Sequence, residues 1–267
     1  MNKQKTIIFQ KSLKVQKAKI LAPFSERYKK IASLHALPSE LHSVLGNCIS
    51  FNKGNAIFVK NHKAACSTIS HLIYKHECGH DYVEENIHHE YTRLVQGLPN
   101  FPAVVNTLMN PASFKFTFVR DPVSRSVSAF KNIFLDRSND AWLRHRDAIR
   151  EFNFHDSDPL EKQFNVFLDY VSESIRQEPY LTDPHFRRQI DNIGIEHINF
   201  DFVGRVENIR ADLNKISHVL PCISEVHSDG KKIRSVNKSK VQYNPNSKQI
   251  SRIKDIYRYD YERFSFL

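Results

Sequence analysis

The chain has 267 residues, of which 40% are hydrophobic, so it can bury a substantial core as one domain or as one domain with appendages. It contains neither the run of roughly 20 apolar residues that spans a bilayer nor the apolar segment of a secretory signal. Its four cysteines are too few for a disulfide scaffold and show no paired metal-ligand spacing. We therefore expect a soluble, cytoplasmic protein with free thiols.

The net charge of +10 is concentrated near the N-terminus. Residues 1–30 hold nine Lys and Arg side chains, with Glu26 as their only acidic residue, which gives this segment a charge of +8. Such an arm can meet an anionic glycan, a membrane surface or a nucleic acid, or it can be a solvated leader. We expect a basic leader over residues 1–50, with at most peripheral membrane contact and no nucleic-acid partner, before one folded domain over residues 51–267.

Short apolar runs alternate with stretches of helical periodicity along this domain, which predicts an α/β fold with a largely parallel sheet. Strands are expected at residues 55–61, 114–119 and 198–203. Helices are expected at residues 67–78, from Pro122 onward, and at 160–176, 208–220 and 246–264. Two polar segments of the sequence each lie in a loop between the end of an expected strand and the start of the next expected helix.

The first of these segments, residues 61–68, reads Asn-His-Lys-Ala-Ala-Cys-Ser-Thr. A lysine, small residues and hydroxyls at the start of a helix are typical of a phosphate cradle, because backbone N–H groups and the positive end of the helix face the anion. The segment contains no glycine and is not a Walker A loop. An ordinary strand-to-helix loop with an exposed lysine is the alternative.

The second segment begins with Arg120 at the end of a strand and includes Ser128 two turns along the next helix. A guanidinium offers forked donors to phosphate oxygens, and a serine hydroxyl adds one more. Taken alone, the Arg-Asp-Pro turn is more often a helix start at which Asp121 accepts backbone N–H groups ahead of Pro122. The two segments together favour a binding site for a phosphorylated ligand.

Both segments resemble motifs of the sulfotransferases that use 3′-phosphoadenosine 5′-phosphosulfate (PAPS). The closest resemblance is to the membrane-type carbohydrate enzymes related to the chondroitin, HNK-1 and heparan 2-O-sulfotransferases. That family has Pro-Lys-x-(Ala/Gly)-(Cys/Ser)-(Ser/Thr) and Arg-Asp-Pro-x-x-Arg-x-x-Ser; here His62 replaces the proline. Looser similarities at residues 183–189, 201–207, 237–239 and 256–264 follow in the family order.

The resemblance implies a P-loop-like parallel sheet flanked by helices, in a single sulfotransferase domain that transfers a sulfuryl group from PAPS to a carbohydrate hydroxyl. The acceptor would be a glycan or glycoconjugate, with acidic glycans and glycolipids as candidates, and no metal is required. By resemblance, Lys63 contacts the 5′-phosphosulfate and stabilises charge on the bridging oxygen. The other implied donor-binding residues are Ala64, Ala65, Cys66, Ser67 and Thr68 in the loop, with Arg120 and Ser128 at the 3′-phosphate.

An acceptor hydroxyl must lose its proton, and histidine is the side chain best suited to remove it near neutral pH. His88 and His89 lie between the two motifs, with Glu85 and Glu90 available to orient an imidazole. His185, in an Asp-x-His segment, is the second choice, and His62 is the third. Together with Cys78, the pair at 88 and 89 fits no known zinc-ligand spacing.

Two other classes of function compete with this interpretation. A nucleotide-dependent kinase would use similar loop chemistry, but the glycines of a Walker A motif and a clear magnesium-binding carboxylate after a strand are missing. A non-catalytic polyanion-binding protein would exploit the basic N-terminal segment, and its binding would depend steeply on salt and not on a nucleotide.

Overall fold

The computed structural model describes residues 5–10, 15–83, 87–88, 101–222 and 242–266. Its contacts divide the chain into two compact units, each built from separate stretches of sequence. The sheet unit comprises Ser12–Val119 and Ile193–Asn237, and the helical unit comprises Met1–Lys11, Arg120–Asn192 and Lys238–Leu267. The division between Val119 and Arg120 assigns the loop at residues 61–68 to the sheet unit and the Arg-Asp-Pro turn to the helical unit.

The sheet unit contains four strands in the order β1-β2-β3-β4. Strand β2 (Ala56–Val59) pairs in parallel with β3 (Phe114–Val119), which pairs in parallel with β4 (Phe202–Arg205). Strand β1 (Cys48–Phe51) lies antiparallel to β2 at the edge. The expected α/β fold with a largely parallel sheet is confirmed. The division of the chain at residue 50 stays a prediction, and the sheet itself begins at Cys48.

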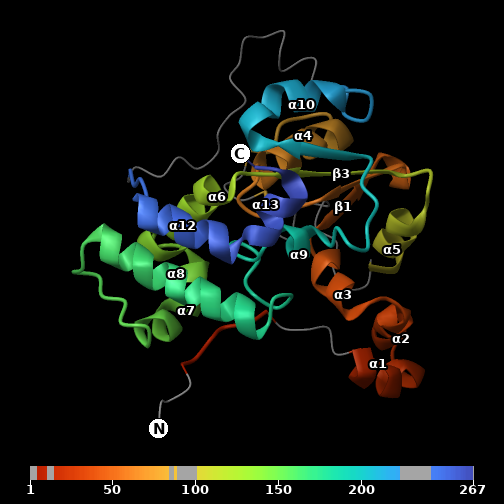
Figure 1. Cartoon of the computed structure of the whole chain (residues 1–267). Helices are drawn as coiled ribbons and strands as arrows, with labels where there is room; N and C mark the ends of the chain where they lie inside the picture. The colour runs from red at the N-terminus through yellow and green to blue at the C-terminus, as the bar shows by residue number, and fades with distance from the viewer. Residues whose placement is uncertain (1–4, 11–14, 84–86, 89–100, 223–241, 267) are drawn as a thin grey trace. The chain divides into compact units, whose positions relative to one another are not determined.

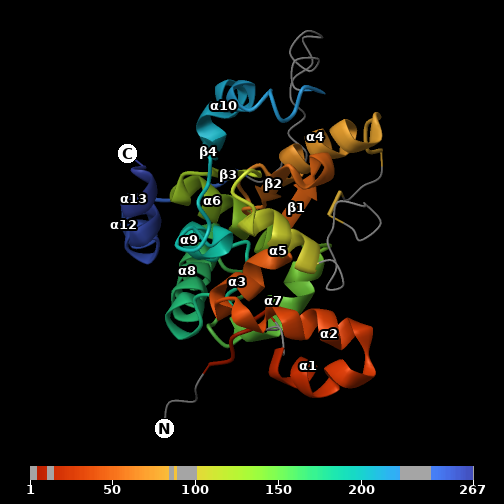
Figure 2. The same ribbon diagram turned by 90° about the vertical axis from the view of Figure 1, so that its right-hand side faces the viewer.

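Helices cover both faces of this sheet, and Figures 1 and 2 show α4 (Cys66–Cys78) and α10 (Ile209–Lys215) on one side, with α3 (Ser39–Leu45) and α5 (Phe101–Met109) on the other. Side chains alternate along a strand, so Phe58, Phe116 and Phe118 share one face. They form an apolar cluster with residues of α4 and α10. A Cβ at Gly204 would lie 2.4 Å from the ring of Phe118, so only glycine fits at this point of β4.

Short helices precede the sheet and follow its last strand. Before the sheet lie α1 (Val15–Leu21), η1 (Ala22–Phe24), α2 (Glu26–Ala32) and η2 (Ser33–Ala36), and η3 (Asn52–Gly54) joins β1 to β2; η6 (Val206–Asn208) joins β4 to α10. No described helix is long and apolar enough to cross a membrane.

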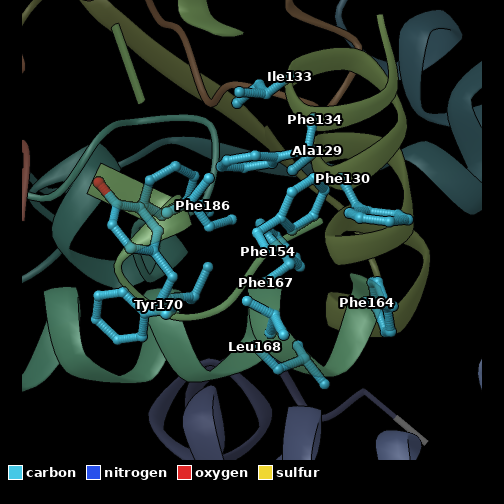
Figure 3. Packing of buried hydrophobic residues seen from close by; sticks show 14 of the residues in the cluster. Ala129, Phe130, Ile133, Phe134, Phe154, Phe164, Phe167, Leu168, Tyr170 and Phe186 are labelled. Carbon is cyan, nitrogen blue, oxygen red and sulfur yellow. The ribbon is translucent and has the colours of Figure 1, made fainter. Parts of the chain in front are cut away.

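The helical unit is organised around an aromatic core. Its helices are α6 (Pro122–Ala129), which continues into the π-helix η5 (Phe130–Leu135), α7 (Asp140–Arg150), α8 (Leu160–Gln177), α12 (Ser247–Ile256) and α13 (Arg258–Phe264). Figure 3 shows Phe130 and Phe134 meeting Phe164, Phe167 and Tyr170 of α8. The rings of Phe130 and Phe164 pack edge to face with centroids 5.1 Å apart. The helix α9 (Gln189–Ile193) lies between α8 and α12 in the sequence, and the division between the two units falls within it, after Asn192.

Most expected elements are present, and some of them differ from the predicted bounds. The predicted strand at 198–203 is wrong by several residues, because β4 pairs only from Phe202. The predicted helix at 246–264 is two helices, since Tyr257 has φ −107° and ψ 24°, outside helical geometry. Its buried hydroxyl donates to the carbonyl of Phe186 at 2.7 Å, which holds the break in place. The helix expected at 208–220 ends at Lys215.

Candidate functional site

The loop between β2 and α4 has a backbone conformation that is unusual for its residues. Lys63 and Ala65 have φ values of +65° and +59°, in the left-handed region that normally favours glycine. Two hydrogen bonds hold the start of the loop. The N–H of Ala64 donates to the carbonyl of Asn61 at 3.1 Å, and the Asn61 amide donates to the carbonyl of Phe118 at 3.0 Å. The end of β3 therefore fixes the loop that follows β2.

This loop ends at the N-terminus of α4, a helix of 13 residues. Ala65 is its N-cap, and within the described chain no side chain caps the helix. The first N–H groups of a helix need acceptors, and they carry the positive end of its dipole. Lys63 precedes this terminus by three residues and adds a cation. An uncapped helix end with a lysine in the preceding loop fits a phosphate or sulfate group.

The electrostatic environment of the loop favours negative charge. Burial alone would raise the pKa of the Cys66 thiol, but the hydrogen bond and charge of His88, together with Lys63 and Lys60, lower it to about 6. Lys60, at the end of β2, is 7% exposed, and burial lowers the pKa of its ammonium group. A field that stabilises a thiolate also stabilises an anionic ligand at this place.

His88 lies directly against the loop. Its Nε2 is 2.9 Å from Oγ of Ser67 and 3.9 Å from Sγ of Cys66. His88 is half-buried, while its neighbour Ile87 is 3% exposed and belongs to the cluster under the sheet. Of the histidines expected to serve as a base, this one is therefore placed beside the loop. His89, Glu85 and Glu90 lie outside the described residues.

The Arg-Asp-Pro turn in the helical unit is held by side chains on both sides of it. The Arg120 N–H donates to Oε1 of Gln189 at 2.9 Å, and Nε2 of Gln189 donates to the Arg120 carbonyl at 2.8 Å. Asp121 caps α6 by accepting the Ser124 N–H at 2.8 Å. The capping interpretation of Asp121 is therefore correct, and it is compatible with a binding role for Arg120.

Arg125, the second arginine of this motif, bonds to backbone carbonyl groups inside the helical unit. It is 1% exposed, and its guanidinium donates to the carbonyls of Arg187 at 2.7 Å and Pro184 at 2.9 Å. Arg125 therefore ties α6 to the segment that carries Gln189. Ser128 lies on the same helix as Arg125 and is half-buried.

His185 belongs to a buried polar network in the helical unit. Its Nδ1 is 2.7 Å from Oδ1 of Asp183, whose Oδ2 is 3.1 Å from Nε2 of His145. Burial alone would raise the pKa of Asp183, but the charges and hydrogen bonds of His185 and His145 hold it well below its usual value. The ionised carboxylate fixes the His185 ring with Nδ1–H toward Asp183, which leaves Nε2 as the basic nitrogen.

The structure thus gathers the sequence-predicted residues in two groups. Residues 63–68 and His88 meet in the sheet unit, whereas Arg120, Ser128 and His185 belong to the helical unit. No role is predicted from the sequence for Gln189, Arg125 or Asp260, although all three lie in segments that resemble the family. Among the described residues, no group of three His, Cys, Asp or Glu side chains is arranged to hold a metal ion.

Comparison with known proteins agrees with these motifs. The chain is 26% identical over 166 residues to carbohydrate sulfotransferase 11 of Danio rerio, an alignment that covers 57% of this chain and 46% of the relative. It is 30% identical over 123 residues to carbohydrate sulfotransferase 10 of the same organism, with 43% and 31% covered. The chain thus spans less than half the length of these relatives, and no solved structure matches. Residues 51–267 match the sulfotransferase family, and the chain belongs to that family.

Proposed function

We propose that this protein transfers a sulfuryl group from PAPS to a hydroxyl of a carbohydrate. The observation that carries the proposal is the glycine-free loop at residues 61–68, where Lys63 and the uncapped N-terminus of α4 form a cationic cradle. Membership in the sulfotransferase family and the similarity to two carbohydrate sulfotransferases support this assignment over a kinase or a passive polyanion binder.

In this proposal the loop binds the 5′-phosphosulfate of the donor. Ser67, Thr68 and the first N–H groups of α4 hold the 5′-phosphate, while Arg120 and Ser128 bind the 3′-phosphate. The acceptor oxygen attacks sulfur as the bond from sulfur to the bridging oxygen breaks. Adenosine 3′,5′-bisphosphate then leaves with the negative charge, and Lys63 stabilises that charge on the bridging oxygen as it develops.

The acceptor proton passes to His88 in this mechanism. A base acts on the oxygen that attacks sulfur, so it belongs close to the loop that binds the phosphosulfate. The 2.9 Å contact between His88 and Ser67 supports this choice. His185 is the second candidate, because Asp183 orients its ring as the carboxylate of a catalytic triad orients a histidine.

The proposal also includes the class of the acceptor and the location of the protein. An acidic glycan or a glycolipid would suit a chain of net charge +10. Peripheral membrane contact through the basic N-terminal segment and a cytoplasmic location stay predictions, and no metal is assigned to the reaction.

Nucleotide binding separates the three classes of function. Calorimetry should show that adenosine 3′,5′-bisphosphate binds and that ATP competes poorly, and labelled PAPS should then transfer its sulfuryl group to members of a glycan panel. Preferential binding of ATP would favour the kinase. Binding only to polyanions, with steep salt dependence and no nucleotide requirement, would reject an enzyme of either class.

A further inference from the structure

The backbone of Arg120, between β3 and α6, is fixed by a side chain from a distant part of the sequence. The side chain of Gln189 accepts the Arg120 N–H at 2.9 Å and donates to the Arg120 carbonyl at 2.8 Å. These two bonds hold the peptide groups on both sides of one Cα atom, much as a neighbouring strand would. Gln189 is fully buried. The direction in which the Arg120 side chain leaves the backbone therefore depends on Gln189.

Gln189 is in turn held by a carboxylate from α13. Asp260 accepts the N–H of Gln189 at 2.9 Å through Oδ2 and the N–H of Ile190 at 3.0 Å through Oδ1. These are the first two N–H groups of α9, which lack partners within their own helix. Asp260 thus caps α9 from a distant part of the sequence, and one chain of hydrogen bonds runs from α13 through Gln189 to Arg120.

We propose that Gln189 and Asp260 are positioning residues that set the orientation of Arg120 toward the 3′-phosphate of the donor. The proposal rests on the proposed function and extends it to two residues that do not touch the nucleotide themselves. Small displacements of a charged, forked donor strongly weaken its bonds to phosphate oxygens, because these bonds depend on distance and direction. Replacement of Gln189 therefore weakens the binding of the 3′-phosphate more than the binding of the rest of the nucleotide.

The burial of Asp260 is consistent with this role. Asp260 is fully buried, and burial raises its pKa to about 6, although the N–H groups of Gln189 and Ile190 and the charge of Arg125 act in the opposite direction. The charge of Asp191 and the hydroxyl of Tyr257 also face this part of the unit. A carboxylate is expensive to bury. The two hydrogen bonds that the Asp260 carboxylate accepts fix the orientation of the first turn of α9.

The test compares two ligands that differ only at the 3′ position. Affinities for adenosine 3′,5′-bisphosphate and adenosine 5′-monophosphate are measured for the wild type, Gln189→Met and Asp260→Asn. Gln163→Met is the matched control, because Gln163 is also buried in the helical unit and donates to the carbonyls of Asp156 and Asp158. We expect Gln189→Met to weaken the bisphosphate about tenfold and the monophosphate less than about twofold, with the control unchanged for both.

Each other result overturns a defined part of the argument. Equal weakening of both ligands by Gln189→Met means that Gln189 is only structural, and unchanged affinity for both rejects the inference outright. If Gln189→Met does not fold, Gln189→Glu is used instead, since it keeps the acceptor for the Arg120 N–H and should show the same selectivity to a smaller degree. A wild type that fails to bind the bisphosphate would instead reject the proposed function itself, and the inference with it.

Discussion

Oγ of Ser67 and Nε2 of His88 lie 2.9 Å apart, which links the start of α4 to a segment 21 residues further along the chain. By the proposed mechanism, Ser67 holds the 5′-phosphate of the donor. In that mechanism, a histidine in contact with this serine is placed to take the proton from the acceptor oxygen as it attacks sulfur. The hydrogen bond and charge of His88 also lower the pKa of the neighbouring Cys66 thiol, so His88 shapes the electrostatic environment of the whole loop.

The base is identified by replacing His88, His89 and His185 individually with Ala. Loss of a general base lowers the rate of sulfuryl transfer by about two to four orders of magnitude. We expect that loss for His88→Ala, and the limb of the pH profile that reports the base should disappear with it. Exposed His155 provides the control, His155→Ala, with an unchanged rate. If all three test variants keep near-wild-type rates, the base is not one of these histidines.

Arg120→Ala should weaken the binding of adenosine 3′,5′-bisphosphate by about 1.5–3 kcal/mol, because a charge-assisted contact to the 3′-phosphate is removed. Calorimetric titration measures this loss directly. Arg252→Ala is the control, since Arg252 belongs to the same unit and pairs with Asp169 at the surface. Equal affinities of wild type and Arg120→Ala would show that Arg120 does not bind the nucleotide.

Lys63→Ala should reduce turnover far more than nucleotide affinity. The lysine charge matters most when the bond between sulfur and the bridging oxygen breaks, so its loss appears mainly in the transition state. Single-turnover transfer at saturating donor separates this effect from binding. Lys215→Ala removes an exposed lysine that pairs with Asp212 and should change neither quantity. An unchanged single-turnover rate for Lys63→Ala would remove this residue from the chemistry.

Cys66 should react as a thiolate at unusually low pH. Its pKa is lowered to about 6, so its modification by methyl methanethiosulfonate should rise between pH 5 and 7. Burial raises the pKa of Cys48 to about 12, and that thiol should stay unreactive throughout. Peptide mass spectrometry reports both sites. In His88→Ala the rise at Cys66 should shift to higher pH; a wild-type midpoint near pH 9 would contradict the assigned environment.

Asp260 gives the helical unit a specific dependence on pH. Its pKa is about 6 in the folded chain against an ordinary value of 3.8, so the folded state binds the proton more tightly than the unfolded state. The stabilisation that protonated Asp260 contributes to the folded state is complete below about pH 4, and it is lost as the pH rises through about 6. From pH 4 to 7, wild type should lose on the order of 2 kcal/mol of unfolding free energy relative to Asp260→Asn. Urea denaturation measures it; a constant difference would contradict the raised pKa.

The sequence was sufficient to predict the elements with strong local signals. Phe114–Val119 is a strand with the expected bounds, and α8 differs from its predicted range by one residue. A run of apolar residues and a long amphipathic pattern each determine their structure nearly alone. The start of β4 could not be predicted, because it depends on where β3 offers partners, with Phe116 opposite Phe202.

The residues that support the candidate site could not be predicted for a related reason. Gln189 and Asp260 act through hydrogen bonds to backbone groups 69 and 71 residues away. A polar residue in a sequence does not reveal which distant peptide group it will meet. The Asp-x-His spacing at 183 and 185 was a usable local signal, since Asp183 bonds both the ring and the N–H of His185.

The helical unit is formed by three stretches that are far apart in the sequence, so its folding depends on long-range contacts. Arg187 donates to Oε1 of Gln10 across 177 residues, and Gln189 reaches Asp260 across 71. Contacts of such long range close large loops and form slowly. The ribosome must synthesise Asp260 before the first two N–H groups of α9 can donate to its carboxylate oxygens. The turn at Arg120 therefore gains its supporting hydrogen bonds late in biosynthesis, long after β3 has left the exit tunnel.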